Sequence, residues 1–464
     1  MAGMYPGSLQ TMNATPNPYT GQVEHQQRLH DAAQLEQRIA SATAAFAGWS
    51  STPWEQRAGV LRRAAQALRA QAPELAALMR AEMGKLQREG VAEVNKCASV
   101  CEYYADHAQA MLADEPIATE ARRSYVRHEP LGCVLAVMPW NFPFWQVFRF
   151  LAPALMAGNV ALLKHAANVP RCADAIAGLL AGAGLPAGVF GVLHIDNEQT
   201  ATVVADRRIR AVSLTGSERA GSAVAANAGR HLKKCVLELG GSDAFIVLAD
   251  ADLEAAVAAA AASRFDNAGQ TCIAAKRFIV LPEVADAFVR GLVHAAGQRV
   301  YGDPADAQTS LAPMARADLR DELDRQVRQS VAAGAQVLIG GAPLVQTHAG
   351  YPATVLDHVA AGMPAYAEEL FGPVAAVIRV PDVATAIAVA NDTDYGLGGS
   401  VWGADVQAAE AVTAALQCGA AFVNAPVRSD PRLPFGGCKR SGFGRELGRA
   451  GLLELVNSKT VYLA

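Results

Sequence analysis

Apolar side chains recur with the spacing of amphipathic helices from about residue 29 to residue 112. Two breaks interrupt this helical region, at residues 51–53 (STP) and near Gly84, and both contain residues that commonly end helices. Residues 1 to about 25 are rich in Pro, Gly, Asn and Thr, so we expect an irregular leading segment. Around residues 124–137 the side chains become β-branched and apolar, which predicts a change from helices to strands.

Beyond this point short apolar runs alternate with helical segments. We expect the strands of a first series at residues 135–138, 160–164, 210–215 and 236–239, with helices after Pro143, Pro170 and Ser217. A second series has strands at residues 245–248 and 277–281, separated by an Ala-rich helix, and a last strand is expected at 456–463. Such alternation is typical of a parallel sheet covered by helices on both faces, so we predict an α/β fold.

Composition and charge narrow the class of protein. The 464 residues are enough for about three domains. The net charge of −4 gives no electrostatic reason to bind nucleic acid or an anionic membrane, so neither is an expected partner. The longest apolar runs, such as residues 255–262, are far shorter than the ~20 residues of a membrane span. Residues 1–10 lack a basic segment followed by an apolar one, so we expect no secretory signal and a cytoplasmic location.

The eight cysteines form no CxxC pair. Cys97 and Cys101 lie four residues apart in a helical region, but no histidine lies nearby to complete a metal site, so no metal is predicted. Seven of the eight are interpreted as reduced thiols of a cytosolic protein. Cys272 differs because it follows the Ala-rich helix in a polar loop, residues 267–271 (NAGQT), in which Gly269 permits a tight turn.

Cys272, Asn141 and Glu238 supply the groups that oxidation of an aldehyde through a thioester requires. A thiolate attacks a carbonyl carbon, although a free thiol with a pKa of roughly 8.5 needs local help to ionise. Asn141 lies between two prolines that restrict its loop, so its amide can be fixed as an oxyanion donor. Glu238 ends a strand of the parallel series, where ligands usually bind, and its carboxylate can activate water. A loop cysteine or a loop asparagine taken singly is more often structural, whereas a surface salt bridge is an unlikely role for Glu238 because residues 235–239 are otherwise apolar.

Three stretches resemble those of the aldehyde dehydrogenase superfamily, namely residues 139–143 (PWNFP), 238–241 (ELGG) and 269–272 (GQTC). The resemblance runs from about residue 13 to the end of the sequence and includes residues 434–446 (PFGGCKRSGFGRE). It implies that Cys272 is the nucleophile, Asn141 the oxyanion donor and Glu238 the general base. Residues 164–166 (KHA) and 233–243 (KKCVLELGGSD) are typical of bacterial NAD(P)-dependent succinate semialdehyde dehydrogenases, which implies that substrate.

The same resemblance implies the domain organisation. A Rossmann-type NAD(P)-binding domain would comprise residues 1–121 and 135–240, and an α/β catalytic domain residues 241–435. A small β oligomerisation element would comprise residues 122–134 and 436–464. Strands left unpaired in that element would be exposed edges unless another subunit covered them, so we expect a homodimer or a homotetramer.

The cofactor site also follows from the resemblance. Residues 215–221 (TGSERAG) follow a strand and open a helix, where backbone N–H groups bind phosphate, although their glycines do not match GxGxxG. The implied NAD(P)-binding residues are Pro139, Trp140, Lys164, Ala167, Gly216, Ser217, Leu239, Glu369 and Phe371. NAD-specific relatives commonly carry Glu at the position of Ala167, so here a 2′-phosphate meets no repulsion and can pair with Lys164. The sequence therefore admits NAD or NADP.

A substrate carboxylate requires a cationic or hydroxyl-rich pocket, and the resemblance implies Arg149, Trp145 and Ser429 as substrate-binding residues. Some relatives carry an arginine just before the nucleophile loop, where this chain has Asp266, so we expect Asp266 to point away or to pair with an arginine. This departure keeps glutarate semialdehyde and aromatic or aliphatic aldehydes as alternative substrates. A CoA-acylating dehydrogenase and a non-catalytic binding relative are further alternatives. The presence of Glu238 argues against the former, and the retention of all three chemical groups argues against the latter.

Overall fold

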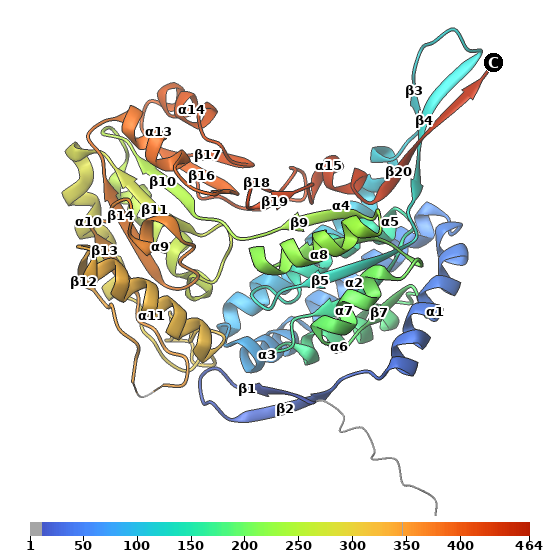
Figure 1. Ribbon diagram of the computed structural model, residues 1–464, viewed down its shortest axis with the longest axis horizontal. Coiled ribbons are helices and arrows are strands. Elements are labelled where there is room, and N and C mark those ends of the chain that lie inside the picture. Colours follow the sequence, from blue (N-terminus) through green and yellow to red (C-terminus); the bar gives the residue numbers. More distant parts are fainter. Residues whose placement is uncertain (1–11, 346) are drawn as a thin grey trace, which may run out of the picture.

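The computed structural model describes residues 12–345 and 347–464, and it opens with a hairpin followed by four helices (Figure 1). The hairpin consists of β1 (Met12–Pro16) and β2 (Val23–Arg28), and the helices are α1 (Ala32–Ser50), α2 (Trp54–Ala70), α3 (Ala72–Met83) and α4 (Gln87–Met111). Both predicted helix breaks are confirmed. The second falls at Gly84, whose φ of +77° is a left-handed conformation that glycine adopts without strain.

The expectation of an irregular leading segment is wrong for the described part of it, because β1 and β2 pair in antiparallel register, with Met12 opposite Arg28. Most side chains of this hairpin are exposed. It therefore lacks the alternation of apolar and polar residues by which a half-buried strand is predicted. The remainder of the expected segment, residues 1–11, lies outside the described residues.

The first large sheet has six strands in the order β19-β9-β8-β5-β6-β7. They are β5 (Cys133–Met138), β6 (Val160–His165), β7 (Phe190–Val192), β8 (Ile209–Thr215), β9 (Lys234–Glu238) and β19 (Gly442–Phe443). All neighbours are parallel except β19 and β9. The strands are connected by α5 (Trp145–Met156), α6 (Pro170–Gly182), α7 (Asn197–Ala205) and α8 (Glu218–Arg230). The helices predicted after Pro143, Pro170 and Ser217 are confirmed as α5, α6 and α8, whereas α7 and β7 had not been predicted.

The second large sheet has seven strands in the order β12-β13-β14-β11-β10-β16-β17. They are β10 (Asp243–Val247), β11 (Ala275–Val280), β12 (Gln336–Ile339), β13 (Thr354–Asp357), β14 (Val374–Arg379), β16 (Gly398–Trp402) and β17 (Ala420–Val423). The associated helices are α9 (Leu253–Phe265), α10 (Pro282–Gly297), α11 (Ala317–Ala332), α12 (Pro364–Ala367), α13 (Val383–Asn391) and α14 (Val406–Ala414). The predicted strands at 245–248 and 277–281 are confirmed, and β12 to β17 had not been predicted.

A narrow three-stranded sheet projects from the rest of the molecule (Figure 1). It consists of β3 (Glu115–Pro116), β4 (Arg123–Pro130) and β20 (Val456–Leu463), and β20 pairs with β4 along its whole length. The last predicted strand, residues 456–463, is thereby confirmed. Two short strands, β15 (Tyr395–Gly396) and β18 (Cys438–Lys439), form a separate two-stranded sheet, and the helix α15 (Gly448–Leu453) directly precedes β20. Within the described ranges, no helix has the length and apolar character needed to cross a membrane.

Candidate active site

Strand order brings the first two candidate residues to one edge of the first sheet. Asn141 follows the end of β5, and Glu238 is the last residue of β9. Both strands run parallel to β8, which lies between them, so their carboxyl ends meet at the same edge. This is the edge at which parallel sheets usually bind ligands.

Cys272 lies in a loop whose backbone follows an uncommon path. After α9 the chain forms a short 3-10 helix, Asp266–Gly269, in which Asn267, Ala268 and Gly269 have φ values of 53°, 51° and 69°. A Cβ atom at Gly269 would lie 2.3 Å from the carbonyl oxygen of Gly372. Glycine is therefore required at this position by both conformation and space, as the predicted tight turn implied.

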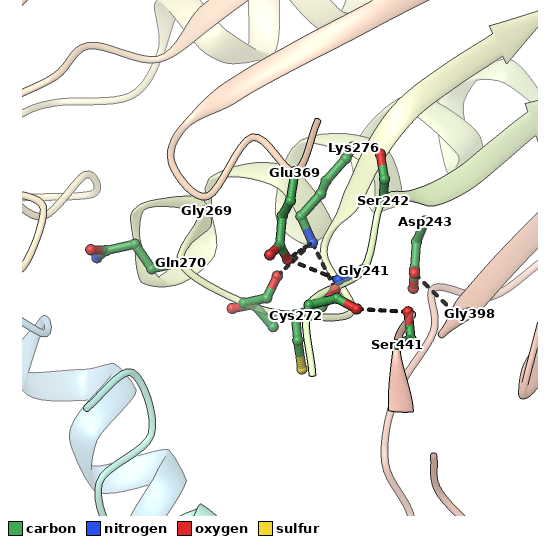
Figure 2. A network of polar contacts seen from close by, with 12 residues as sticks. Gly241, Ser242, Asp243, Gly269, Gln270, Cys272, Lys276, Glu369, Gly398 and Ser441 are labelled. Atoms are coloured by element: carbon green, nitrogen blue, oxygen red, sulfur yellow. Dashed lines mark hydrogen bonds and ion pairs between the residues drawn. The ribbon is translucent and has the colours of Figure 1, made fainter. Parts of the chain in front are cut away.

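The backbone of Cys272 is held by a cation. The Lys276 ammonium donates to the carbonyl oxygens of Cys272 at 2.7 Å and of Thr271 at 3.0 Å. It also lies 3.2 Å from a carboxylate oxygen of Glu369, which accepts a hydrogen bond of 3.0 Å from the Gly241 amide. Figure 2 shows that this network involves the backbone of Cys272 and leaves its sulfur pointing away from Lys276. Lys276 thus connects the nucleophile loop with a residue implied to bind the cofactor.

The thiol itself lies in a dehydrated environment. Burial raises the pKa of Cys272 to about 11, and the positive charges of Arg149 and Lys276 oppose that rise. At neutral pH the thiol of the free protein is therefore largely protonated. A further interaction, or the binding of substrate, is needed to convert the Cys272 thiol into the reactive thiolate.

The Asn141 loop is fixed by contacts with residues far away in the sequence. The Asn141 side-chain amide donates to the carbonyl oxygen of Gln270 at 3.0 Å, which joins it to the nucleophile loop. The carbonyl oxygen of Asn141 accepts from the Lys85 ammonium at 2.8 Å and from the Asn267 amide at 3.1 Å. The prolines alone therefore do not set the position of this loop.

A buried ion pair supports the same loop from α4. Glu93 pairs with Lys85, and both side chains are almost fully excluded from solvent. The other carboxylate oxygen of Glu93 accepts hydrogen bonds from the backbone amides of Phe144 and Trp145, at 2.8 and 2.9 Å. These amides lie at the start of α5, where a carboxylate satisfies donors that have no partner within the helix. No short sequence motif marks Lys85 or Glu93, and sequence reasoning missed both.

Glu238 is only 2% exposed, and among the described residues neither of its carboxylate oxygens has a hydrogen-bond partner. Burial raises its pKa well above the ordinary value, the nearby carboxylate of Glu446 raises it further, and Arg149 opposes both effects. A Cβ atom at Gly436 would lie 2.5 Å from one of the Glu238 oxygens, so only glycine leaves room for this carboxyl group. A buried carboxylate with a raised pKa is a stronger base than an exposed one.

A cavity of about 400 Å³ lies beside Cys272. Arg149, Trp145 and Ser429 line it, so the structure brings the three implied substrate residues together with Cys272, while Glu238 and Asn141 do not line it. Arg149 is almost fully buried, and its guanidinium forms an ion pair with Glu446 and donates to the Thr215 hydroxyl at 3.2 Å. Its charge is therefore already balanced within the protein.

Two further features of the cavity concern charged groups. Asp266 lines it and pairs with Arg299 at 3.2 Å, so the expectation that Asp266 pairs with an arginine is confirmed. Lys96, a residue of α4, also lines the cavity, and sequence reasoning missed it. Its position far from the recognised stretches, in a helical region with no distinctive motif, explains the omission.

The implied cofactor residues lie at several positions around the carboxyl ends of the strands of the first sheet. Lys164 and Ala167 line a second cavity of about 630 Å³, which also contains Arg316. Trp140 and Phe371 pack edge to face, with 5.8 Å between their ring centroids. Pro139 follows β5 directly, and Leu239 follows β9 and is buried.

Residues 215–221, which the resemblance implies to bind the pyrophosphate, include the capped start of α8. Ser217 caps α8 by accepting a hydrogen bond from the Ala220 amide at 3.3 Å. A Cβ atom at Gly216 would meet no atom closer than 3.6 Å, so the space beside the helix start is open. By contrast, a Cβ atom at Gly221 would lie 2.5 Å from the Leu239 side chain, so this glycine permits close packing of helix and strand. An open helix N-terminus beside the sheet edge fits a dinucleotide.

Comparison with known proteins gives concordant results. A model of the aldehyde dehydrogenase family matches residues 6–461. The chain is 49% identical over 451 residues to a protein of Synechocystis named a probable succinate-semialdehyde dehydrogenase using NADP+, covering 97% of this chain and 99% of that protein. It is 47% identical over 446 residues to the succinate semialdehyde dehydrogenase named Sad of Escherichia coli, which uses NAD(P)+, covering 96% of each. The solved succinic semialdehyde dehydrogenase of Streptococcus pyogenes with NADP+ aligns with a TM-score of 0.94 at 38% identity, covering 97% of this chain and 99% of that one.

Proposed function

Because the chain belongs to the aldehyde dehydrogenase family, we propose that it oxidises succinate semialdehyde to succinate with NAD(P), through a thioester on Cys272. The observation that carries this proposal is the identity of 45 to 49% with relatives named for that activity, over almost their whole length. The cavity beside Cys272 supports it, since Arg149 and Ser429 line that cavity and a substrate carboxylate requires such groups.

In the first half of the reaction, the Cys272 sulfur forms a bond to the aldehyde carbon, and the carbonyl oxygen acquires negative charge. The Asn141 side-chain amide and the Cys272 backbone N–H donate to this oxyanion. Loss of one such donor typically costs ~2.7–4 kcal/mol of transition-state stabilisation, so the rigid support of the Asn141 loop by Lys85 and Asn267 matters for rate. NAD(P) supplies, when bound, the acceptor for the hydride that leaves the substrate carbon.

In the second half, Glu238 takes a proton from water, and the resulting hydroxide attacks the thioester carbon. The thiol is released as the leaving group, and the product is a carboxylic acid. Burial makes Glu238 a stronger base, as its raised pKa indicates. Its carboxylate oxygens have no hydrogen-bond partner in the part of the chain that the structure describes, so the deprotonated form can accept that proton.

The residues that would hold NAD(P) are those implied by the resemblance, and their positions in the structure support this assignment. Lys164 and Ala167 would receive the adenosine ribose, and the lack of a carboxylate at Ala167 accommodates a 2′-phosphate. Gly216 and Ser217 would receive the pyrophosphate at the start of α8, together with the nearby backbone of Leu239. Glu369 and Phe371, with Pro139 and Trp140 opposite, would hold the nicotinamide ribose and ring.

We also propose that the protein is a cytoplasmic homodimer or homotetramer. All eight cysteines are free, as a reducing compartment favours. The projecting sheet of β3, β4 and β20 has exposed side chains along β20 and one unpaired edge on that strand. Pairing with a second subunit would cover this edge, so residues 122–134 and 436–464 are the proposed oligomerisation element. Light scattering of the purified protein tests this assignment, and a monomeric mass at micromolar concentration would contradict it.

The experiment that tests the activity measures cofactor reduction with succinate semialdehyde, hexanal and benzaldehyde, using NAD and NADP in parallel. We expect a clear preference for the semialdehyde and complete loss of reduction in Cys272→Ala, with circular dichroism verifying that the variant is folded. Equal or better rates with the uncharged aldehydes would retain the reaction class and refute the substrate. The absence of reduction with any aldehyde would refute the reaction class.

A further inference from the structure

Lys96 brings a positive charge into the cavity beside Cys272. Its ammonium donates a hydrogen bond to the Ser429 hydroxyl at 2.7 Å. It also lies 4.2 Å from the ring centroid of Trp145, in a cation–π arrangement. Helix α4 thus positions a cation next to two of the three residues already implied to bind the substrate.

This charge is not neutralised by an ion pair. Within residues 12–345 and 347–464, no carboxylate lies within 4.0 Å of the Lys96 ammonium. Burial lowers the pKa of Lys96 to about 8, and the positive charge of Arg149 contributes to that shift. The local environment therefore disfavours the charge that a protonated Lys96 carries, and an anion placed beside it would relieve this cost.

The other charged groups around the cavity already have partners or favour the neutral form. Arg149 pairs with the buried Glu446, and Asp266 pairs with Arg299. Glu89 accepts a hydrogen bond from the Asn267 amide at 3.0 Å, and burial raises its pKa, which favours the protonated carboxyl.

We propose that Lys96, together with Ser429, binds the carboxylate of the substrate and is the residue that selects anionic aldehydes. This inference rests on the proposed function, and it identifies the Lys96 ammonium as the positive charge that recognises the substrate carboxylate. Some relatives supply a cation from the position that Asp266 occupies here, and in this chain helix α4 supplies it instead. The aromatic and aliphatic side chains that line the same cavity would surround the methylene chain, namely Phe142, Trp145, Ile273, Val427 and Phe435.

The test compares succinate semialdehyde with butanal, an aldehyde of the same carbon count that lacks the carboxylate. In Lys96→Met, the ratio of kcat/KM for the semialdehyde to kcat/KM for butanal should fall by about 10- to 100-fold, which is the loss expected for a hydrogen bond to a charged group. Lys96→Arg should recover part of this ratio because it retains the charge. Lys459→Met, on the projecting sheet, is the matched control that also replaces a lysine by methionine, and it should keep the wild-type ratio.

A direct binding measurement separates recognition from chemistry. The inhibition constant of the product succinate, measured with butanal as the varied substrate, should rise in Lys96→Met by a similar factor. An unchanged ratio and inhibition constant in a folded Lys96→Met protein would overturn the assignment to Lys96 while the proposed function stands. An equal fall for both aldehydes would also overturn it, because that result indicates a structural role. A wild-type preference for butanal would overturn the proposed substrate and this inference together.

Discussion

The Lys276 ammonium holds the backbone carbonyl oxygen of Cys272 at 2.7 Å. It also contacts Glu369, so one side chain links the nucleophile loop to a residue proposed to bind the nicotinamide ribose. Replacing Lys276 should therefore disturb two measurable properties at once, the reactivity of the thiol and the affinity for the cofactor.

In Lys276→Met we expect the rate of Cys272 alkylation by iodoacetamide at pH 8 to fall about 3- to 10-fold, because a positive charge that favours the thiolate is lost. The KM for NADP should change in the same variant, since Glu369 loses its cation. Lys276→Arg retains the charge and should show a smaller effect on alkylation. If the alkylation rate of Lys276→Met had the same dependence on pH as that of the wild type, the electrostatic role of Lys276 would be contradicted.

The thiol should be poorly reactive in the free enzyme. Because burial raises the pKa of Cys272 to about 11, the thiolate fraction at pH 7 to 9 is small. Below the pKa this fraction increases about tenfold for each pH unit, so the alkylation rate should rise with that slope between pH 7 and pH 9. Mass spectrometry of the labelled peptide assigns the reaction to Cys272, and a plateau below pH 8 would show that another group lowers the pKa.

Glu238→Gln separates the two halves of the reaction. The variant should release a burst of reduced cofactor of up to one equivalent per site and then turn over at least about 100-fold more slowly, because only the attack of water needs the carboxylate. Stopped-flow absorbance at 340 nm, a wavelength characteristic of the reduced nicotinamide, measures both phases. Equal loss of the burst and of the steady state would exclude a role confined to hydrolysis.

Gly269→Ala should be strongly destabilising, since the left-handed φ of +69° and the contact of 2.3 Å with the Gly372 carbonyl both disfavour a Cβ atom. A loss of about 1–3 kcal/mol in the free energy of unfolding is expected from backbone strain of this kind. The matched control is Gly178→Ala on the exposed face of α6, where an added Cβ atom meets nothing within 4 Å. That change should be neutral or stabilising in the same thermal unfolding assay.

Ala167→Glu should shift cofactor preference toward NAD. The new carboxylate would enter the cavity that contains Lys164 and would repel a 2′-phosphate, so the ratio of kcat/KM for NADP to that for NAD should fall about 10- to 100-fold. Ala167→Gln adds similar bulk without charge and should change the ratio much less. An equal effect of the two substitutions would indicate that space rather than charge governs this position.

The sequence predicted the features that depend on local pattern. The alternation of strands and helices, the breaks near residues 51–53 and Gly84, and the turn at Gly269 are all present in the structure. The strands from β12 to β17 were not predicted. In that region apolar runs alone do not distinguish a buried strand from a helix.

The parts of the site that sequence reasoning missed depend on contacts between distant segments. Lys85, Glu93 and Lys96 come from the helical region near the start, and each contacts a loop that was recognised for other reasons. Periodicity predicts that a residue lies on a helix, but it does not reveal which loop that helix meets. The polar character of Lys85 and Glu93 would have suggested a solvent-exposed face, whereas they are buried because they neutralise each other.

The antiparallel pairing of β19 with β9 places Gly442 opposite Glu238. The first sheet is therefore completed by a segment that is synthesised long after its other five strands. A second contact of this kind joins Asn159 to the same late part of the chain, because its side-chain amide donates to the carbonyl oxygen of Leu455 at 2.8 Å. During synthesis, β9 would remain an open edge until the strands of the second large sheet have been made and the chain has returned to the first. Such closure between distant segments slows folding, so the final surroundings of Glu238 form only after the segment that contains β19 has been made.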